Sequence, residues 1–175
     1  MAATVLTDLR SGIVPVLQAM QAQLVAASVV PVERCFLVAR DPVKTERYQG
    51  PQEVYLRPLG FLADDPNVTG GGRIDTRFTR SVEITLRTRN DRDQSGQDPH
   101  FLTDIDTHFA LEEAVVNALQ LFFPVDSSGN GLVIAGIRVM SGTLVERSIE
   151  DDLVGWSKLI WEVIYYPPID TTVLG

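Results

Sequence analysis

Hydrophobic residues recur at helical spacing in a first segment near the N-terminus. The residues of this stripe, three or four positions apart, are Leu9, Ile13, Leu17, Met20 and Leu24. The pattern predicts an amphipathic helix that runs to about Ala27 and ends before Pro31. Pro15 lies inside the pattern, so it either kinks the helix or belongs to its first turn.

A second helix is predicted from Thr103 or Asp106 to about Phe122, because Pro124 follows where prolines commonly end helices. Its apolar stripe consists of Leu111, Val115, Leu119 and Phe122, joined by Phe109 and Val116.

Elsewhere, hydrophobic and polar residues alternate with the period of two that is typical of β-strands. The predicted strands are Glu33–Arg40, Gln52–Pro58, Arg73–Arg89, Gly131–Ser141 and Lys158–Tyr166. In the longest of them, Val82, Ile84 and Leu86 are expected to face the core, and Ser81, Glu83, Thr85, Arg87 and Arg89 to face outward. This strand is longer than a small domain usually covers, so part of it should project as a hairpin or pair with a neighbour's sheet.

The order of these elements predicts an α+β fold. We expect a mainly antiparallel or mixed β-sheet of four to five strands, with two α-helices packed on one face and a long loop or hairpin arm. A single domain should span residues 1–168, followed by a C-terminal tail at 169–175. Residues 59–72 form the most loop-like stretch and are predicted to be a flexible loop or arm that contacts a partner. Its candidate contact residues are Asp64, Asp65, Gly70, Gly71 and Gly72.

Composition then narrows the function classes. The chain has 175 residues, a net charge of −8, two histidines and one cysteine. A charge this negative argues against binding nucleic acid by bulk attraction. A lone cysteine excludes an internal disulfide framework. Two histidines and one cysteine are too few ligands for a typical His/Cys zinc site, which is therefore nearly excluded. Neither a signal peptide nor a membrane span is indicated.

Catalytic motifs are absent from the sequence. It contains no G-x-S-x-G and no H-E-x-x-H motif, residues 127–131 are typical of a turn, and Cys35 is expected to be a small buried hydrophobe. Asp104, His108 and Glu112 are spaced to lie on one helical face, which suits either a metal site or, as we favour, a solvated polar face. We therefore predict no catalytic, metal or cofactor-binding residues and no enzyme.

Between Arg73 and Arg92 the chain is locally basic, with six arginines against Asp75, Glu83 and Asp91, a local charge of +3. Such a segment could contact an acidic face of another subunit, remain solvated, or bind nucleic acid. The first is favoured, because arginine suits defined ion pairs. The predicted interface residues are Arg73, Asp75, Arg77, Arg80, Arg87, Arg89 and Asp91.

Three segments together resemble the tail terminator proteins of tailed bacteriophages, the minor tail protein U-like family. They are Gly72–Arg77 with the strand ending at Asp91, the helix Ala110–Leu119, and the closing strand Trp156–Tyr166. The resemblance covers roughly residues 5–168. The Asp41–Gly72 region and the tail after Pro168 depart from the shortest members of the family.

The resemblance implies a structural protein without enzymatic residues or cofactors. It would form a homo-oligomer, a hexameric ring that caps the tail tube, stops its polymerisation and joins it to the head connector. Its partners would be the tail tube protein and the head–tail connector or stopper protein, with DNA passing through the lumen without specific binding and no membrane contact. It would be located in the tail or neck of the virion and assembled in the cytoplasm of the bacterial host.

Other functions remain open from the sequence. A neck or head-completion (stopper) protein, or the cap of a phage-tail-like contractile injection system, would have a similar sequence pattern. A small cytoplasmic α+β binding or hydrolytic domain would instead require convergent polar residues in a pocket.

Overall fold

The computed structural model of the chain describes residues 2–42, 52–63, 67–69, 73–75, 78–89, 101–133, 136–144 and 154–165. Two long helices and seven strands occur in these ranges. In chain order the elements are α1 (Ala2–Ala26), a 3-10 turn η1 (Val32–Arg34), β1 (Cys35–Leu37), β2 (Gln52–Ala63), β3 (Asn67–Thr69), β4 (Arg73–Asp75), β5 (Phe78–Arg89), α3 (Phe101–Leu119), β6 (Arg138–Leu144) and β7 (Val154–Tyr165).

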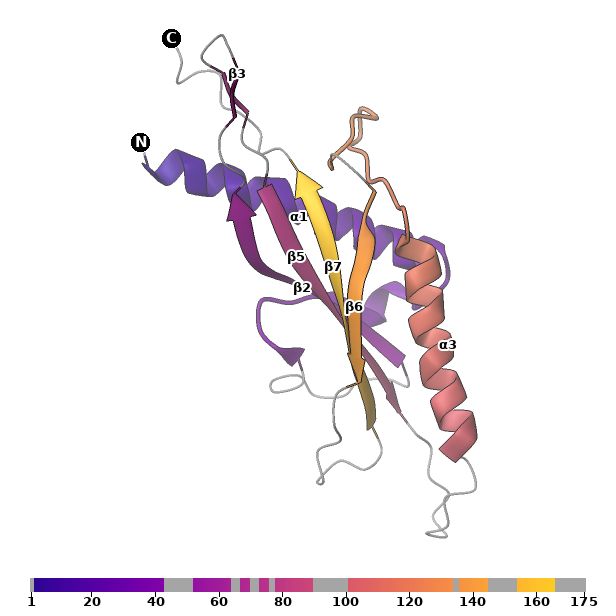
Figure 1. The fold of residues 1–175 in the computed structure, drawn as a ribbon. Coiled ribbons are helices and arrows are strands. Elements are labelled where there is room, and N and C mark those ends of the chain that lie inside the picture. The colour runs from indigo at the N-terminus through magenta and orange to yellow at the C-terminus, as the bar shows by residue number, and fades with distance from the viewer. Residues whose placement is uncertain are drawn as a thin grey trace.

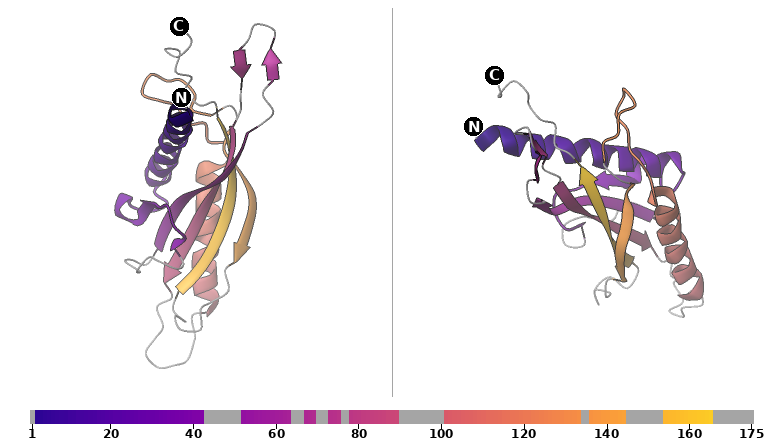
Figure 2. Two further views of the ribbon diagram at one scale, coloured as in Figure 1. Left: turned by 90° about the vertical axis from the view of Figure 1, so that its left-hand side faces the viewer. Right: turned by 45° about the horizontal axis from the view of Figure 1, so that its top comes forward.

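Five of the strands form one open, twisted sheet with the order β1-β2-β5-β7-β6 (Figure 1). β1 runs parallel to β2, and the other neighbours are antiparallel, so the sheet is mixed. Both helices pack against the same face of the sheet (Figure 2). The predicted α+β architecture is confirmed.

The core lies between the helices and this face of the sheet. Alternating residues of the central strands, such as Val82 and Ile84 of β5 and Trp161 of β7, are fully buried there. They meet Met20 of α1 and Val115 of α3 in one cluster. Burying side chains of this size stabilises the fold by roughly 1.5–3 kcal/mol each.

Helix α1 ends in a Schellman motif. The Val29 amide donates to the carbonyl of Leu24, and the Ser28 amide donates to that of Val25. Ser28 takes a left-handed conformation with φ of 58°. Pro15 lies inside the helix rather than in its first turn.

The strand predicted at 33–40 is much shorter in the structure. Val32–Arg34 forms a 3-10 turn, and only Cys35–Leu37 pairs with β2. The alternating side-chain pattern continues past Leu37, so it predicted a strand that is too long. The hydrogen-bond ladder between β1 and β2 ends where the Val38 amide donates to the carbonyl of Leu56.

Residues 59–72 are not one loop. β2 continues to Ala63, with an irregularity in its pairing to β5 between Pro58 and Phe61. Pro58-Leu59-Gly60 has the composition of a turn, yet it forms this bulge and the ladder resumes after it. β3 and β4 then form a separate antiparallel hairpin that projects beyond the main sheet (Figure 2), which is the arm that the fold prediction allowed.

The strand predicted at 131–141 is shifted. Gly131 and Ile137 form only isolated bridges, with Val125 and Phe122 respectively, and the continuous strand is Arg138–Leu144. An irregularity between Val139 and Ser141 divides its pairing with β7. β6 forms one edge of the sheet.

Candidate functional site

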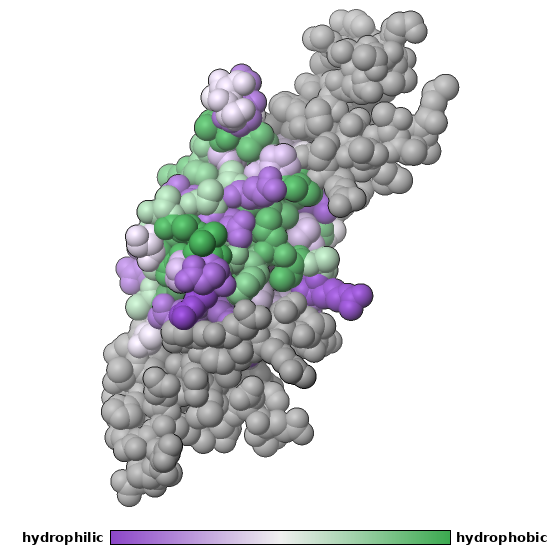
Figure 3. Space-filling view, turned by 180° about the vertical axis from the view of Figure 1, so that it is seen from behind, coloured by the Kyte–Doolittle hydropathy of each residue, from purple (hydrophilic) through white to green (hydrophobic). Residues whose placement is uncertain are grey.

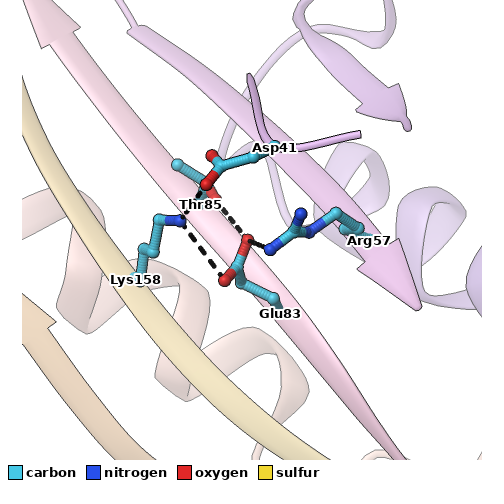
Figure 4. Close-up of polar contacts among 5 residues, drawn as sticks. All are labelled: Asp41, Arg57, Glu83, Thr85 and Lys158. Atoms are coloured by element: carbon cyan, nitrogen blue, oxygen red, sulfur yellow. Dashed lines mark hydrogen bonds and ion pairs between the residues drawn. The ribbon is translucent and has the colours of Figure 1, made fainter. Parts of the chain in front are cut away.

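The face of the sheet that points away from the helices carries a row of ion pairs (Figure 4). The Arg57 guanidinium lies 2.9 Å from Glu83 Oε1, and Lys158 Nζ lies 3.4 Å from Glu83 Oε2. Lys158 Nζ is also 2.9 Å from Asp41 Oδ2, and the Thr85 hydroxyl donates to Glu83 Oε1 at 3.3 Å. This ion-pair row (Asp41, Arg57, Glu83 and Lys158) ties β2, β5 and β7 to the segment after β1.

The row follows from a complementary sequence pattern. Residues 53–57 read E-x-Y-x-R and residues 83–87 read E-x-T-x-R. Antiparallel pairing of β2 with β5 places Glu53 opposite Arg87 and Arg57 opposite Glu83. Opposite charges in directly paired positions stabilise a sheet, and this signal was available in the sequence.

Arg87 is at the centre of a second group, which we call the Arg87 cluster (Glu53, Tyr55, Arg87 and Trp156). Its guanidinium lies 3.3 Å from Glu53 Oε2 and 4.5 Å from the centre of the Trp156 ring. The Tyr55 hydroxyl donates to Glu53 Oε2 at 2.6 Å. Burial, and then the hydrogen bond to Glu53, raise the pKa of Tyr55. Glu53 is fully buried and Arg87 is 3% exposed, so this group is internal.

Asp41 shows how the chain covers this face. It follows β1 at one edge of the sheet, yet it pairs with Lys158 of β7, two strands beyond β2. The segment after β1 therefore crosses the face over β2 and β5, as Figure 4 shows.

Together the two groups balance three acidic against three basic side chains. Each charge has an intramolecular partner of opposite sign, so the arrangement cross-links the strands. Within the described residues, no group of three or more His, Cys, Asp or Glu side chains could hold a metal ion. On this face the paired charges tie the strands of the sheet together.

The predicted arginine interface is divided by the structure. Arg73 and Asp75 lie in β4 of the projecting hairpin, whereas Arg80, Arg87 and Arg89 lie in β5.

Within β5, strand alternation places Arg80 and Arg87 on opposite faces of the sheet. Arg80 donates to the carbonyl of Leu59 at 3.2 Å. Arg87 pairs inside the chain, so reversing its charge would disturb the protomer itself. The predicted subunit contact of this segment stays a prediction. The remaining predicted residues lie outside the described ranges: Asp64, Asp65, Gly70, Gly71, Gly72, Arg77 and Asp91.

His108 differs from its predicted place on a solvated helix face. It is 7% exposed and points to the sheet, with Nδ1 2.8 Å from the Thr88 hydroxyl and Nε2 3.0 Å from the Ser157 hydroxyl. Burial lowers its pKa, and the carboxylate of Glu112, 3.6 Å away, opposes part of that shift. Either neutral tautomer satisfies both hydroxyls, so the ring anchors α3 to β5 and β7. The side chain of Asp104, the third residue of that face, lies outside the described part.

Cys35 is buried in the core, as predicted, and burial raises the pKa of its thiol to about 12. Such a thiol stays protonated and unreactive at neutral pH. In the part of the chain that the structure describes, we find no helix with the length and apolarity to cross a membrane.

No protein-family model matches the chain. No curated protein sequence matches it either. Among solved structures, a chain of the "Virion of native gene transfer agent (GTA) particle" superposes with a TM-score of 0.54. This fold is shared with a virion protein. The match covers 86% of the present chain and 93% of the other, with 16% sequence identity. At that identity the likeness extends to the fold.

Proposed function

We propose that the chain is a structural protein of a phage-like virion, and specifically a tail terminator. The observation that carries the proposal is the fold shared with a gene transfer agent virion chain over 86% of this chain. The sequence resemblance to tail terminators agrees with it. The proposed protein forms a ring on the end of the tail tube, stops tube growth and presents a surface to the head connector.

The internal charge pairing favours a structural role over catalysis. A terminator has to keep its shape while it binds the tube on one side and the connector on the other. The ion-pair row and the Arg87 cluster, which bind four segments of the chain together, suit such a rigid part. The proposed role needs no cofactor and no enzymatic residue, and it locates the protein in the tail or neck of a virion assembled in the host cytoplasm.

A tube-growth assay tests this function. Purified tail tube protein from the same genome would be polymerised with and without the chain, and tube lengths measured by electron microscopy. We expect added chain to arrest growth and to appear as a ring at one tube end. An unrelated acidic protein of similar size controls for charge. Unchanged tube length without an end ring would contradict the proposal, and binding to the head connector alone would indicate a stopper protein instead.

A further inference from the structure

The outer face of helix α1 carries no charge from Val14 to Ala26. No Asp, Glu, Lys, Arg or His occurs from Ser11 to Val32, although charged residues make up 22% of the chain. Among the helix residues whose burial the structure describes, 12–26, the exposed positions recur every four residues. They are Val14, Gln18, Ala22 and Ala26. A helix on the surface of an isolated protein usually carries charges there.

A second uncharged area follows α3. In the segment 121–125, Leu121 is 75% exposed, Phe123 48% and Val125 51%. Alternation turns Phe122 inward, where it packs against the core. Two backbone hydrogen bonds fix this orientation, because Leu121 N donates to Ile137 O and Ile137 N donates to Phe122 O.

Leu121 has an unfavourable backbone conformation for its side chain. Its φ is 62°, a left-handed value at which glycine or asparagine is the usual residue after a helix. Most of the leucine side chain is exposed, so its packing within the protomer adds little stability to offset this strain. A strained and exposed leucine points to a role outside the protomer.

The two areas are neighbours. The Gln23 side chain of α1 donates to the carbonyl of Ala118 at 3.1 Å, three residues before Leu121. The space-filling view in Figure 3, seen from behind relative to Figure 1, shows hydrophobic residues interspersed with hydrophilic ones on this side of the described molecule. We call the apolar residues of the two areas, Val14, Ala22, Ala26, Leu121, Phe123 and Val125, the apolar surface. The polar but uncharged Gln18 lies among them.

We infer that the apolar surface binds a second copy of this chain. The inference rests on the proposed ring, because it names the surface that joins its subunits. Two copies each carry −8, so their net charges repel each other as they approach. An uncharged surface is the one on which like-charged copies can come together without that cost. The contact therefore relies on apolar burial and not on the arginines of β5.

The test compares self-association of the full chain at about 50 mM and about 500 mM NaCl by analytical ultracentrifugation. For the wild type, we expect salt to strengthen association, because it screens the repulsion between copies. The variant Leu121→Asn/Val125→Thr removes apolar area, and asparagine accepts the left-handed conformation. We expect its dissociation constant to rise at least about tenfold, while its melting temperature stays within about 2 °C of the wild type.

The matched control is Met140→Thr, which alters an equally exposed apolar residue on the edge strand β6. It should associate like the wild type. The inference is overturned if the double variant associates normally, if Met140→Thr weakens association equally, or if salt weakens wild-type association. A wild-type chain that stays monomeric throughout also overturns it. In each case the tube-growth assay still tests the proposed function independently of this surface.

Discussion

At the scale of single residues, His108 shows how a buried polar side chain can link a helix to the sheet. Its two ring nitrogens bond hydroxyls on neighbouring strands, which a leucine at this position could not do. The cost is sensitivity to acid, because the protonated ring must be accommodated in a largely dry site.

The first residue-scale prediction concerns pH. The folded protein holds His108 with a pKa below the unfolded value of about 6.5. The unfolded chain therefore binds more protons in the window between the two values, and stability is lost as the pH falls from about 6.5 towards the folded pKa. We expect the melting temperature to decrease between about pH 7.5 and pH 5.5, where carboxylates titrate little.

The control for this pH effect is His108→Gln, whose amide can still bond both hydroxyls but does not titrate. Its melting temperature should change less over the same window, measured by circular dichroism. Parallel curves for the two proteins would show that His108 is not the responsible group.

At the scale of elements, the central strands depend on the Arg87 cluster. Arg87→Met keeps most of the side-chain volume but removes a cation beside the fully buried Glu53. We expect the free energy of unfolding, measured in urea, to fall by about 3 kcal/mol. Arg138→Met is the matched control, since its ion pair with Glu162 is exposed and should contribute about 0–1 kcal/mol. Equal losses in the two variants would contradict a buried role for Arg87.

A double replacement separates charge burial from packing. Glu53→Leu combined with Arg87→Met removes both charges together, so it should recover much of the stability lost in Arg87→Met. If the double variant is as unstable as the single one, the cluster contributes through shape and not through paired charges.

Sequence periodicity was sufficient to predict those elements whose two faces differ clearly in polarity. The stripe from Ile13 to Leu24 and the alternation of Val82 and Ile84 each match a buried face of the structure. It failed where polar residues are also buried. Glu83 and Arg87 look like outward-facing residues, and only the cross-strand register reveals their partners Arg57 and Glu53 on β2.

The candidate site was harder to predict than the fold. The spacing of His108 and Glu112 shows that they share a helix face, but not whether that face meets solvent or the sheet. Exposure of Leu121 and Phe123 depends on the bridge between residues 122 and 137, a contact that periodicity does not contain. Apolar residues after a helix look like core in sequence, and only tertiary pairing shows them to be surface.

At the scale of the whole molecule, the charge distribution decides what a ring of such chains would do to DNA. Each chain carries −8, so six copies would carry about −48. The total already includes the basic segment, and two of its arginines do not share a surface, because Arg87 is buried inside the protomer and Arg80 lies on the other face of β5. Phosphate binding needs several cations on one surface.

The last prediction is therefore that the chain does not bind duplex DNA, which would slide through the proposed ring. In fluorescence anisotropy with a labelled duplex, we expect no binding up to about 100 µM chain, even at about 20 mM salt, where electrostatic attraction is strongest. The low salt concentration makes this a demanding test. Binding that weakens steeply as salt is added would instead mean that the arginines between 73 and 92 present a shared phosphate-contacting surface, which would favour the nucleic-acid function for this segment.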